Sequence, residues 1–133
     1  MDPAPSFGPE KTPYDALGGD ERVRLLVDTF YDHMDRESEY AAIRSLHPAD
    51  LSTSREKLYE FLSGWLGGPP LYVQKHGHPR LRGRHMPFPI GAAERDAWLG
   101  CMARTLDELG VEGELRAFLD GRFAHVADFM RNR

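Results

Sequence analysis

Apolar residues recur at the i, i+3, i+4, i+7 spacing of an amphipathic helix in four separate stretches. These stretches run from Val23 to Met34, from Leu58 to Leu66, from Ala97 to Leu109 and from Leu115 to Met130. No stretch alternates apolar and polar residues with the period of two that a half-buried strand requires. The pattern therefore predicts four long helices and an all-α fold.

Residues that break or cap helices mark the ends of these stretches. Asp20 is expected to be the N-cap of the first helix, and Thr53-x-x-Glu56 has the spacing of a capping box ahead of the second. Two glycines and two prolines at 67–70 should end the second helix, because proline cannot continue one. Two shorter helices are expected at 14–17 and within 36–46.

The stretch from Pro69 to Ala93 departs from this pattern in both stiffness and charge. It holds five prolines and three glycines, so at most one short helix is expected, between Pro79 and Met86. It contains no Asp or Glu, although the chain has 21 of them, but it carries one lysine and three arginines. Such a segment suits an anionic ligand or a cofactor with carboxylates; pairing with acidic helices nearby is the alternative.

Length and composition predict a single domain in the cytoplasm. The chain has 133 residues, and its one cysteine, Cys101, permits no intrachain disulfide and is typical of a reducing compartment. Apolar runs are too short to span a membrane, and a net charge of -4 argues against a nucleic-acid binder. We expect residues 1–13, with four prolines, to be a flexible extension and residues 14–133 to form the domain.

Three histidines, His76, His78 and His85, lie in the basic segment. They could give nitrogens to zinc, but no Asp, Glu or Cys lies nearby in the sequence to complete a structural site. His85 differs from the other two because Pro87 stops its helix and apolar residues flank it. A histidine held beside apolar groups and cations suits a flat apolar ring with carboxylate tails, and one axial imidazole is enough for haem.

The segment "GGPPLYVQKHGHPRLRGRHMPFPIG", together with "ERDAWLGCM" close behind it, resembles the group II truncated haemoglobins, which are bacterial two-over-two globins. "FYDHM" and the pairs Gly18-Gly19 and Gly67-Gly68 strengthen the resemblance, which runs from about Tyr14 to Phe129. It implies a two-over-two helical sandwich around haem b. It also implies reversible binding of dioxygen, NO and CO at ferrous iron.

The resemblance assigns roles to individual positions. His85 matches the proximal histidine that binds the iron, and Tyr31 and Trp98 match distal groups that face the bound gas. His47 stands where the family often has tyrosine or phenylalanine, so we expect it to change ligand binding between about pH 6 and 8. The expected haem pocket comprises Phe30, Ser54, Leu58, Phe61, Leu62, Met86, Phe88 and Met102. The expected partners of the haem propionates are Lys75, His78, Arg80, Arg82 and Arg84.

Several functions are compatible with such a protein. The polar Tyr/Trp/His pocket favours dioxygen, NO or peroxide redox chemistry, as in a nitric oxide dioxygenase or a peroxidase-like enzyme. Any turnover then needs an external electron donor or reductase, because the sequence contains no flavin or nicotinamide domain. A simple oxygen carrier, store or sensor is the alternative, and a haem-free module that grips an anion is an alternative of another class. Neither nucleic-acid binding nor membrane insertion is expected.

Overall fold

The computed structural model describes Phe7 and residues 11–133, and helices are the regular elements of that part of the chain. The four long helices are α2 (Asp20–Arg36), α4 (Ser52–Trp65), α7 (Ala92–Glu108) and α8 (Gly113–Phe129). Each contains one of the apolar stretches, so the all-α prediction is confirmed. The expected flexible extension at 1–13 falls mostly outside the described residues.

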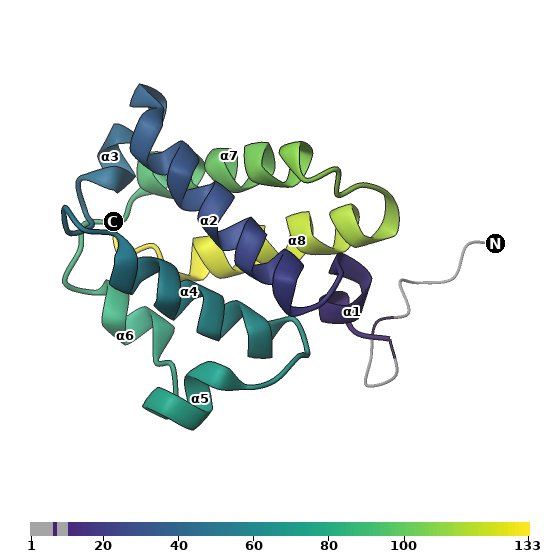
Figure 1. The fold of residues 1–133 in the computed structure, drawn as a ribbon. Coiled ribbons are helices and arrows are strands. Elements are labelled where there is room, and N and C mark those ends of the chain that lie inside the picture. The colour runs from purple at the N-terminus through teal and green to yellow at the C-terminus, as the bar shows by residue number, and fades with distance from the viewer. Residues whose placement is uncertain (1–6, 8–10) are drawn as a thin grey trace.

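The four long helices pack as two layers of two. Figure 1 shows α2 and α4 in front of α7 and α8, and α2 contacts both α4 and α7 while α7 contacts α8. This arrangement is the predicted two-over-two sandwich. Burial of large apolar side chains between the layers supplies most of the stabilising free energy, at about 1.5–3 kcal/mol for each fully buried Leu or Phe. The core includes Val23, Leu26, Val27, Phe30, Met34, Leu62, Leu66, Cys101, Met102, Leu106, Leu119 and Phe123.

Three short helices pack around the long ones, and all lie where short helices are expected. They are α1 (Pro13–Leu17), the 3-10 helix η1 (Ser38–Tyr40) and α3 (Ala41–Arg44). The pair Gly67-Gly68 allows α1 to lie against the end of α4. A Cβ on Gly68 would collide with the ring of Tyr14, and Gly67 has a φ of +96°. The N–H of Tyr14 donates to the carbonyl of Leu66 at 2.9 Å across this contact.

Both expected N-caps are wrong, because Asp20 and Thr53 lie inside their helices, whose N-caps are Gly19 and Leu51. Asp20 is the first residue of α2, and its carboxylate accepts a hydrogen bond from the hydroxyl of Tyr59. Glu56 lies within α4 and accepts a hydrogen bond from Arg24 at 2.7 Å, so Thr53-x-x-Glu56 forms no capping box. In both cases a contact between α2 and α4 takes a side chain that the local pattern assigned to a cap.

The segment 69–93 holds two short helices, so the prediction of at most one is wrong. α6 (Leu81–His85) lies where a helix is expected, but α5 (Leu71–His76) is additional. Pro70 directly precedes α5, where its missing N–H removes no helical hydrogen bond. Gly77 ends α5 with a φ of 80°. The same residue types that forbid a long helix here thus begin and end a short one.

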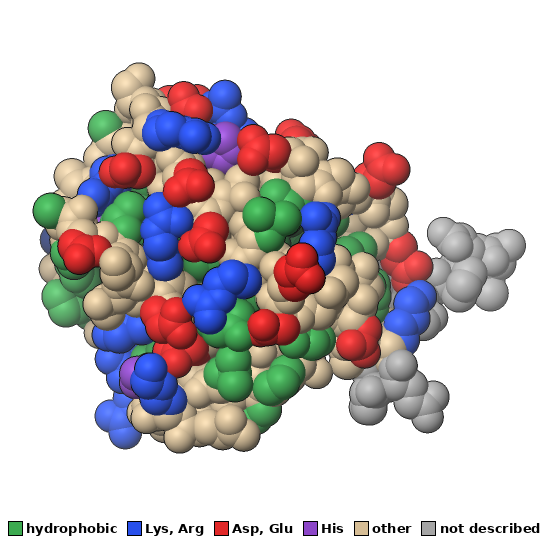
Figure 2. Space-filling view, viewed as in Figure 1, with side chains coloured by type: hydrophobic (Ala, Val, Ile, Leu, Met, Phe, Trp, Pro, Cys, Tyr) green, Lys and Arg blue, Asp and Glu red, His purple; other side chains and the backbone are tan. Residues whose placement is uncertain are grey.

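The molecular surface is unevenly charged. Figure 2 shows acidic and basic side chains interspersed over α2 and α4, whereas Lys, Arg and His side chains gather at the edge formed by α5 and α6. No helix within the described residues is both long enough and apolar enough to cross a membrane.

Candidate functional site

His85 lies at the end of α6 with one ring nitrogen already hydrogen-bonded. Its Nδ1 is 2.6 Å from the carbonyl oxygen of Leu81, one turn earlier in the helix. Because a carbonyl only accepts, Nδ1 carries the proton in the neutral ring, and in that form Nε2 keeps its lone pair. The half-buried ring therefore offers Nε2 for a single bond to a metal, oriented by the backbone behind it.

The turn that leads into α6 is fixed by side chains expected at the haem carboxylates. His78 Nδ1 accepts the backbone N–H of Arg80 at 3.0 Å, and Arg84 Nε donates to the carbonyl of Pro79 at 2.8 Å. Arg80 takes up a left-handed conformation, with φ 48° and ψ 50°. These contacts orient Arg84 and leave its two terminal nitrogens available to an anion.

The three expected distal residues and the expected pocket residue Phe30 form one cluster contributed by three parts of the chain. Tyr31 on α2 is buried, with its ring centroid 5.2 Å from that of Phe30 and 5.7 Å from that of His47. Trp98 on α7 lies 5.3 Å from Phe30, measured in the same way. The structure thus brings together residues that are distant in the sequence.

Two hydrogen-bond donors in this cluster have no partner among the described residues. They are the hydroxyl of Tyr31 and the indole N–H of Trp98. Burial raises the pKa of Tyr31 well above its ordinary value, although the positive charge of Arg55, 5.8 Å from the ring, opposes this. The hydroxyl therefore keeps its proton, and both groups can donate to a ligand that accepts.

His47 has a hydrogen-bonding state that the sequence could not reveal. Its Nδ1 is 2.8 Å from the carbonyl of Ile43, so Nδ1 donates and Nε2 is an acceptor in the neutral ring. Burial lowers the pKa of His47 and the charges of Arg44 and His85 act in the same direction, whereas the bond to Ile43 opposes them. The net pKa lies below the ordinary 6.5. The expected pH effect therefore moves toward the acidic side of the window predicted from the sequence.

Aromatic rings connect this cluster to the far end of α4. Trp98 contacts Phe123 at 5.6 Å between ring centroids, Phe123 stacks on Trp65 at 5.0 Å, and Trp65 stacks on Phe61 at 6.3 Å. Trp65 and Phe123 were not predicted as site residues, because both occupy apolar helix faces that look like ordinary core. The spacing of Phe61 and Trp65, one helical turn apart, is the signal that could have identified Trp65.

The rings of Phe61, Trp65, Trp98 and Phe123 form an aromatic wall. The other expected pocket residues on α4 and α7 lie either beside this wall or in the core. Leu62 and Met102 are buried, at 2% and 1% exposure. Ser54 and Leu58 are half-buried on α4. The structure therefore places Leu62 and Met102 in the core itself, and Ser54 and Leu58 where a ligand can still reach them.

Met86 and Phe88 lie just beyond α6 and are exposed, at 54% and 40%. The guanidinium of Arg82 donates to the sulfur of Met86 at 3.3 Å, which holds the thioether along α6. Exposed apolar groups directly after His85 form a surface that a flat apolar ring can cover.

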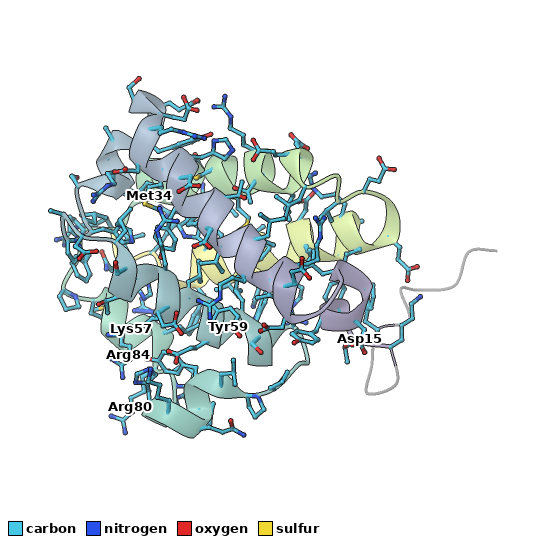
Figure 3. All side chains as sticks on the ribbon, in the orientation of Figure 1. Asp15, Met34, Lys57, Tyr59, Arg80 and Arg84 are labelled. Carbon is cyan, nitrogen blue, oxygen red and sulfur yellow. The ribbon has the colours of Figure 1, made fainter. Side chains whose placement is uncertain are left out.

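The cations near His85 differ in whether they have acidic partners. Arg80, Arg82 and Arg84 form no ion pair with a carboxylate in the part of the chain that the structure describes. Lys75, in contrast, pairs with Glu60 at 3.2 Å. Figure 3 shows Lys57 on α4 at the same edge of the molecule as Arg84 on α6. Lys57 was missed in the sequence because it lies outside the basic segment.

Glu60 on α4 is a buried carboxylate that secures α5. It accepts hydrogen bonds from His76 at 3.0 Å and from Lys75 at 3.2 Å. Burial alone would raise the pKa of Glu60, but the hydrogen bonds and charges of these two partners outweigh it and lower the pKa. A cavity between α4 and α5 lies beside this contact, with Phe61 and Trp65 in its wall. The histidine left without a role in the sequence, His76, thus has a structural one.

These donors and surfaces fit haem b. One imidazole nitrogen is free for the iron, an aromatic wall suits the apolar ring, and arginines without acidic partners suit the propionates. Two donors without a partner among the described residues, one on the buried Tyr31 and one on the half-buried Trp98, suit a polar gas ligand.

Sequence comparison supports this assignment over almost the whole chain. The sequence model of the bacterial-like globin family matches residues 12–132. A group 2 truncated hemoglobin of Bacillus subtilis (strain 168) is 46% identical over 121 residues, which cover 91% of this chain and 89% of that protein.

Solved structures of similar proteins have the same fold. A group II 2-on-2 hemoglobin from Agrobacterium tumefaciens matches with a TM-score of 0.88 and 50% identity, covering 91% of this chain and 94% of that one. A cold-adapted truncated hemoglobin from Pseudoalteromonas haloplanktis TAC125 matches with a TM-score of 0.89 and 45% identity, over 92% and 99%. A truncated oxygen-avid haemoglobin from Bacillus subtilis matches with a TM-score of 0.85 and 45% identity, over 92% and 100%.

Proposed function

This chain belongs to the bacterial-like globin family, whose members bind haem b, and we propose that it holds the iron through His85 and binds dioxygen beside Tyr31 and Trp98. Haem b, when bound, supplies a ferrous iron at which dioxygen, NO or CO can bind. The observation that carries the proposal is a pair of donors in one aromatic cluster, the Tyr31 hydroxyl and the Trp98 indole N–H, for which residues 11–133 and Phe7 offer no partner.

On the proximal side, His85 acts through Nε2 while its Nδ1–H donates to the carbonyl of Leu81. That hydrogen bond fixes the tautomer and the rotation of the ring, and it makes the imidazole a stronger electron donor. A His85→Gly variant should lose this ligand, and added free imidazole should restore it. An unchanged axial ligand in the variant would refute the assignment; absorption and resonance Raman spectra make the comparison.

On the distal side, Tyr31 and Trp98 donate hydrogen bonds to the gas ligand, which acquires negative charge when it is dioxygen. Each bond contributes about 0.5–1.5 kcal/mol net, and more where the acceptor is charged. Because 1.4 kcal/mol is a factor of about ten, two such bonds slow dissociation of dioxygen substantially. His47, neutral and with Nε2 as an acceptor, adjusts this network rather than adding a third donor near neutral pH.

The haem carboxylates are proposed to meet the cations at the edge formed by α4 and α6. Arg84 is the leading partner, because its Nε is tied to Pro79 and its terminal nitrogens stay available. Arg80 and Arg82, expected from the sequence, and Lys57, added by the structure, complete this group. Lys75 is a weaker candidate because it already pairs with Glu60.

We place redox chemistry with dioxygen and NO, or with peroxide, ahead of simple storage. Hydrogen bonds that retain dioxygen oppose the fast release that a carrier needs. The relative from Bacillus subtilis described as oxygen-avid is consistent with such retention. In NO dioxygenation, dioxygen and NO would combine to nitrate with one electron supplied by ferrous haem, and an external donor would return that electron in each cycle.

Mixing the oxygenated ferrous protein with NO in the absence of free dioxygen tests this proposal. We expect one nitrate per haem at a rate too fast for prior release of dioxygen, and repeated turnover when a cellular reductant is added. Nitrate formation no faster than dioxygen release would instead favour a carrier or store.

The haem-free alternative is tested by absorption. Purified protein reconstituted with haem should show a Soret band with a stoichiometry of one haem per chain. Failure to form this band would favour an anion-binding module built on the basic segment.

A further inference from the structure

α6 lies at the edge of the molecule, and none of its five residues is buried. Apolar packing against the other helices therefore does not fix the position of the helix that carries His85. Among contacts within the protein, hydrogen bonds must therefore hold α6 in position. Figure 1 shows that the end of the chain, after α8, lies near the segment that joins α6 to α7.

Asn132, the only asparagine of the chain, makes most of these hydrogen bonds. Its Nδ2 donates to the carbonyl of Phe88 at 2.8 Å and to the carbonyl of His85 at 3.3 Å. Its Oδ1 accepts the backbone N–H of Ile90 at 3.0 Å, and its own N–H donates to the carbonyl of Ile90 at 2.9 Å. One half-buried side chain thus satisfies the backbone at the last residue of α6 and at two positions after it.

Neighbouring residues of the C-terminal segment reinforce this attachment. Arg82 of α6 donates to the carbonyl of Arg131 at 3.3 Å. The N–H of Arg133 donates to the carbonyl of Ile90 at 3.2 Å. α6 is therefore tied to the C-terminal segment near its middle and at its end.

We propose that Asn132 is a positioning residue that sets how His85 meets the haem iron, and this rests on the proposed role of His85 as the iron ligand. The carbonyl of His85 is held by Asn132, while the ring of His85 is held by the carbonyl of Leu81. Backbone and ring are thereby both fixed, so the direction of Nε2 follows from the C-terminal segment. Asn132 touches neither the iron nor the gas and acts only through α6.

The haem-loaded Asn132→Ala variant tests the proposal with two readouts. The iron–histidine stretching band of the deoxygenated ferrous protein should shift and broaden, because α6 can then take several positions. Loss of haem to excess apomyoglobin should become about tenfold faster, which corresponds to about 1.4 kcal/mol. The amide of Ile90 should also exchange its hydrogen faster, because its acceptor is removed.

Two further variants separate positioning from general weakening. Asn132→Asp keeps an acceptor for the N–H of Ile90 but loses both donations to carbonyls, so the Ile90 amide should stay protected while the iron–histidine band still shifts. Arg133→Ala removes an exposed side chain of the same segment without touching Asn132, and it should change neither readout.

An iron–histidine band that is unchanged in Asn132→Ala, alongside faster exchange at Ile90, would show that the contact only stabilises the loop and would overturn the proposal. The proposal would also be overturned if the iron–histidine band of Asn132→Asp were the same as that of the wild-type protein. Failure of the proposed function is recognised separately, because the wild-type protein would then show no iron–histidine band that disappears in His85→Gly.

Discussion

Tyr31 and Trp98 are the residues on which gas retention depends most directly. Tyr31→Phe removes the hydroxyl and keeps the ring contacts with Phe30 and His47. We expect dissociation of dioxygen to accelerate about tenfold, because one hydrogen bond worth about 1.4 kcal/mol is lost. Stopped-flow displacement of dioxygen by CO measures this rate.

A matched control is available in Tyr59→Phe, which breaks the hydrogen bond to Asp20 at the first residue of α2, about three helical turns before Tyr31. This variant should change the free energy of unfolding and leave the dissociation rate of dioxygen unchanged. Equal acceleration in both tyrosine variants would mean that the rate reports general loosening of α2 rather than a distal hydrogen bond.

His47 should make the dissociation rate depend on pH. Above its lowered pKa the ring is neutral and Nε2 accepts; below it Nε2 becomes an N–H donor. We therefore expect dioxygen to dissociate more slowly as the pH falls through a value below 6.5, the ordinary pKa. His47→Phe should abolish this step in the rate profile, and a profile that persists would exclude His47 as the titrating group.

Single residues differed in how far the sequence could predict them. The resemblance was sufficient to propose Tyr31, Trp98 and His85, because each lies within a quoted motif or stripe. The hydrogen-bonding state of His47 was not predictable, because it depends on the carbonyl of Ile43 and on burial. The pairing of Lys75 with Glu60 was also hidden, since the acidic partner comes from α4.

At the scale of elements, the turn into α6 contains two backbone conformations that affect stability in opposite ways. Arg80 adopts a left-handed conformation, with φ 48° and ψ 50°, that glycine adopts more easily. We expect Arg80→Gly to raise the free energy of unfolding by about 1 kcal/mol, because relief of strain exceeds the added entropy of the unfolded chain. Chemical denaturation of the haem-free protein measures the change without the proposed contact between Arg80 and the haem carboxylates.

Gly77, three residues earlier, should show the reverse behaviour. Its φ of 80° and ψ of -157° belong to a region that residues with a Cβ rarely adopt, although nothing would touch an added Cβ. Gly77→Ala should therefore cost about 1–3 kcal/mol through backbone strain alone. A neutral effect would mean that the end of α5 can rearrange freely.

The elements themselves were predictable where a helix has one long apolar face. α2, α4, α7 and α8 all follow from that pattern. α5 was not predicted, because five prolines in one segment argue against a helix there. The structure shows that Pro70 and Gly77 flank α5 and do not interrupt it. Both N-caps failed because contacts between α2 and α4 compete for Asp20 and Glu56, and a local pattern carries no information about distant partners.

At the scale of the whole molecule, Cys101 can report on global unfolding. Its thiol is fully buried between the layers, where Sγ donates to the carbonyl of Phe30 at 3.3 Å. Burial raises the pKa of Cys101 to about 12, so the reactive thiolate is nearly absent in the native state. We expect a thiol reagent to label Cys101 only through unfolding, at a rate that rises with denaturant. Rapid labelling of the native protein would show that the two layers separate locally.

The whole-molecule prediction from the sequence was sound for the two-over-two fold, because the apolar stripes and the quoted motifs agree. It could not include the contact of Asn132 with the segment after α6. Asn132 lies more than forty residues from its partners in the sequence. Its neighbours Arg131 and Arg133 form no motif with it that would indicate such a contact.

The exposed position of α6 has a consequence for how the protein is made. The core of α2, α4, α7 and α8 contains no residue of α6, so a newly synthesised chain can complete that core before α6 settles. We therefore expect capture of haem to be a late step that follows formation of the four-helix core. In a cell short of haem we expect a folded, haem-free protein to accumulate in place of an unfolded chain.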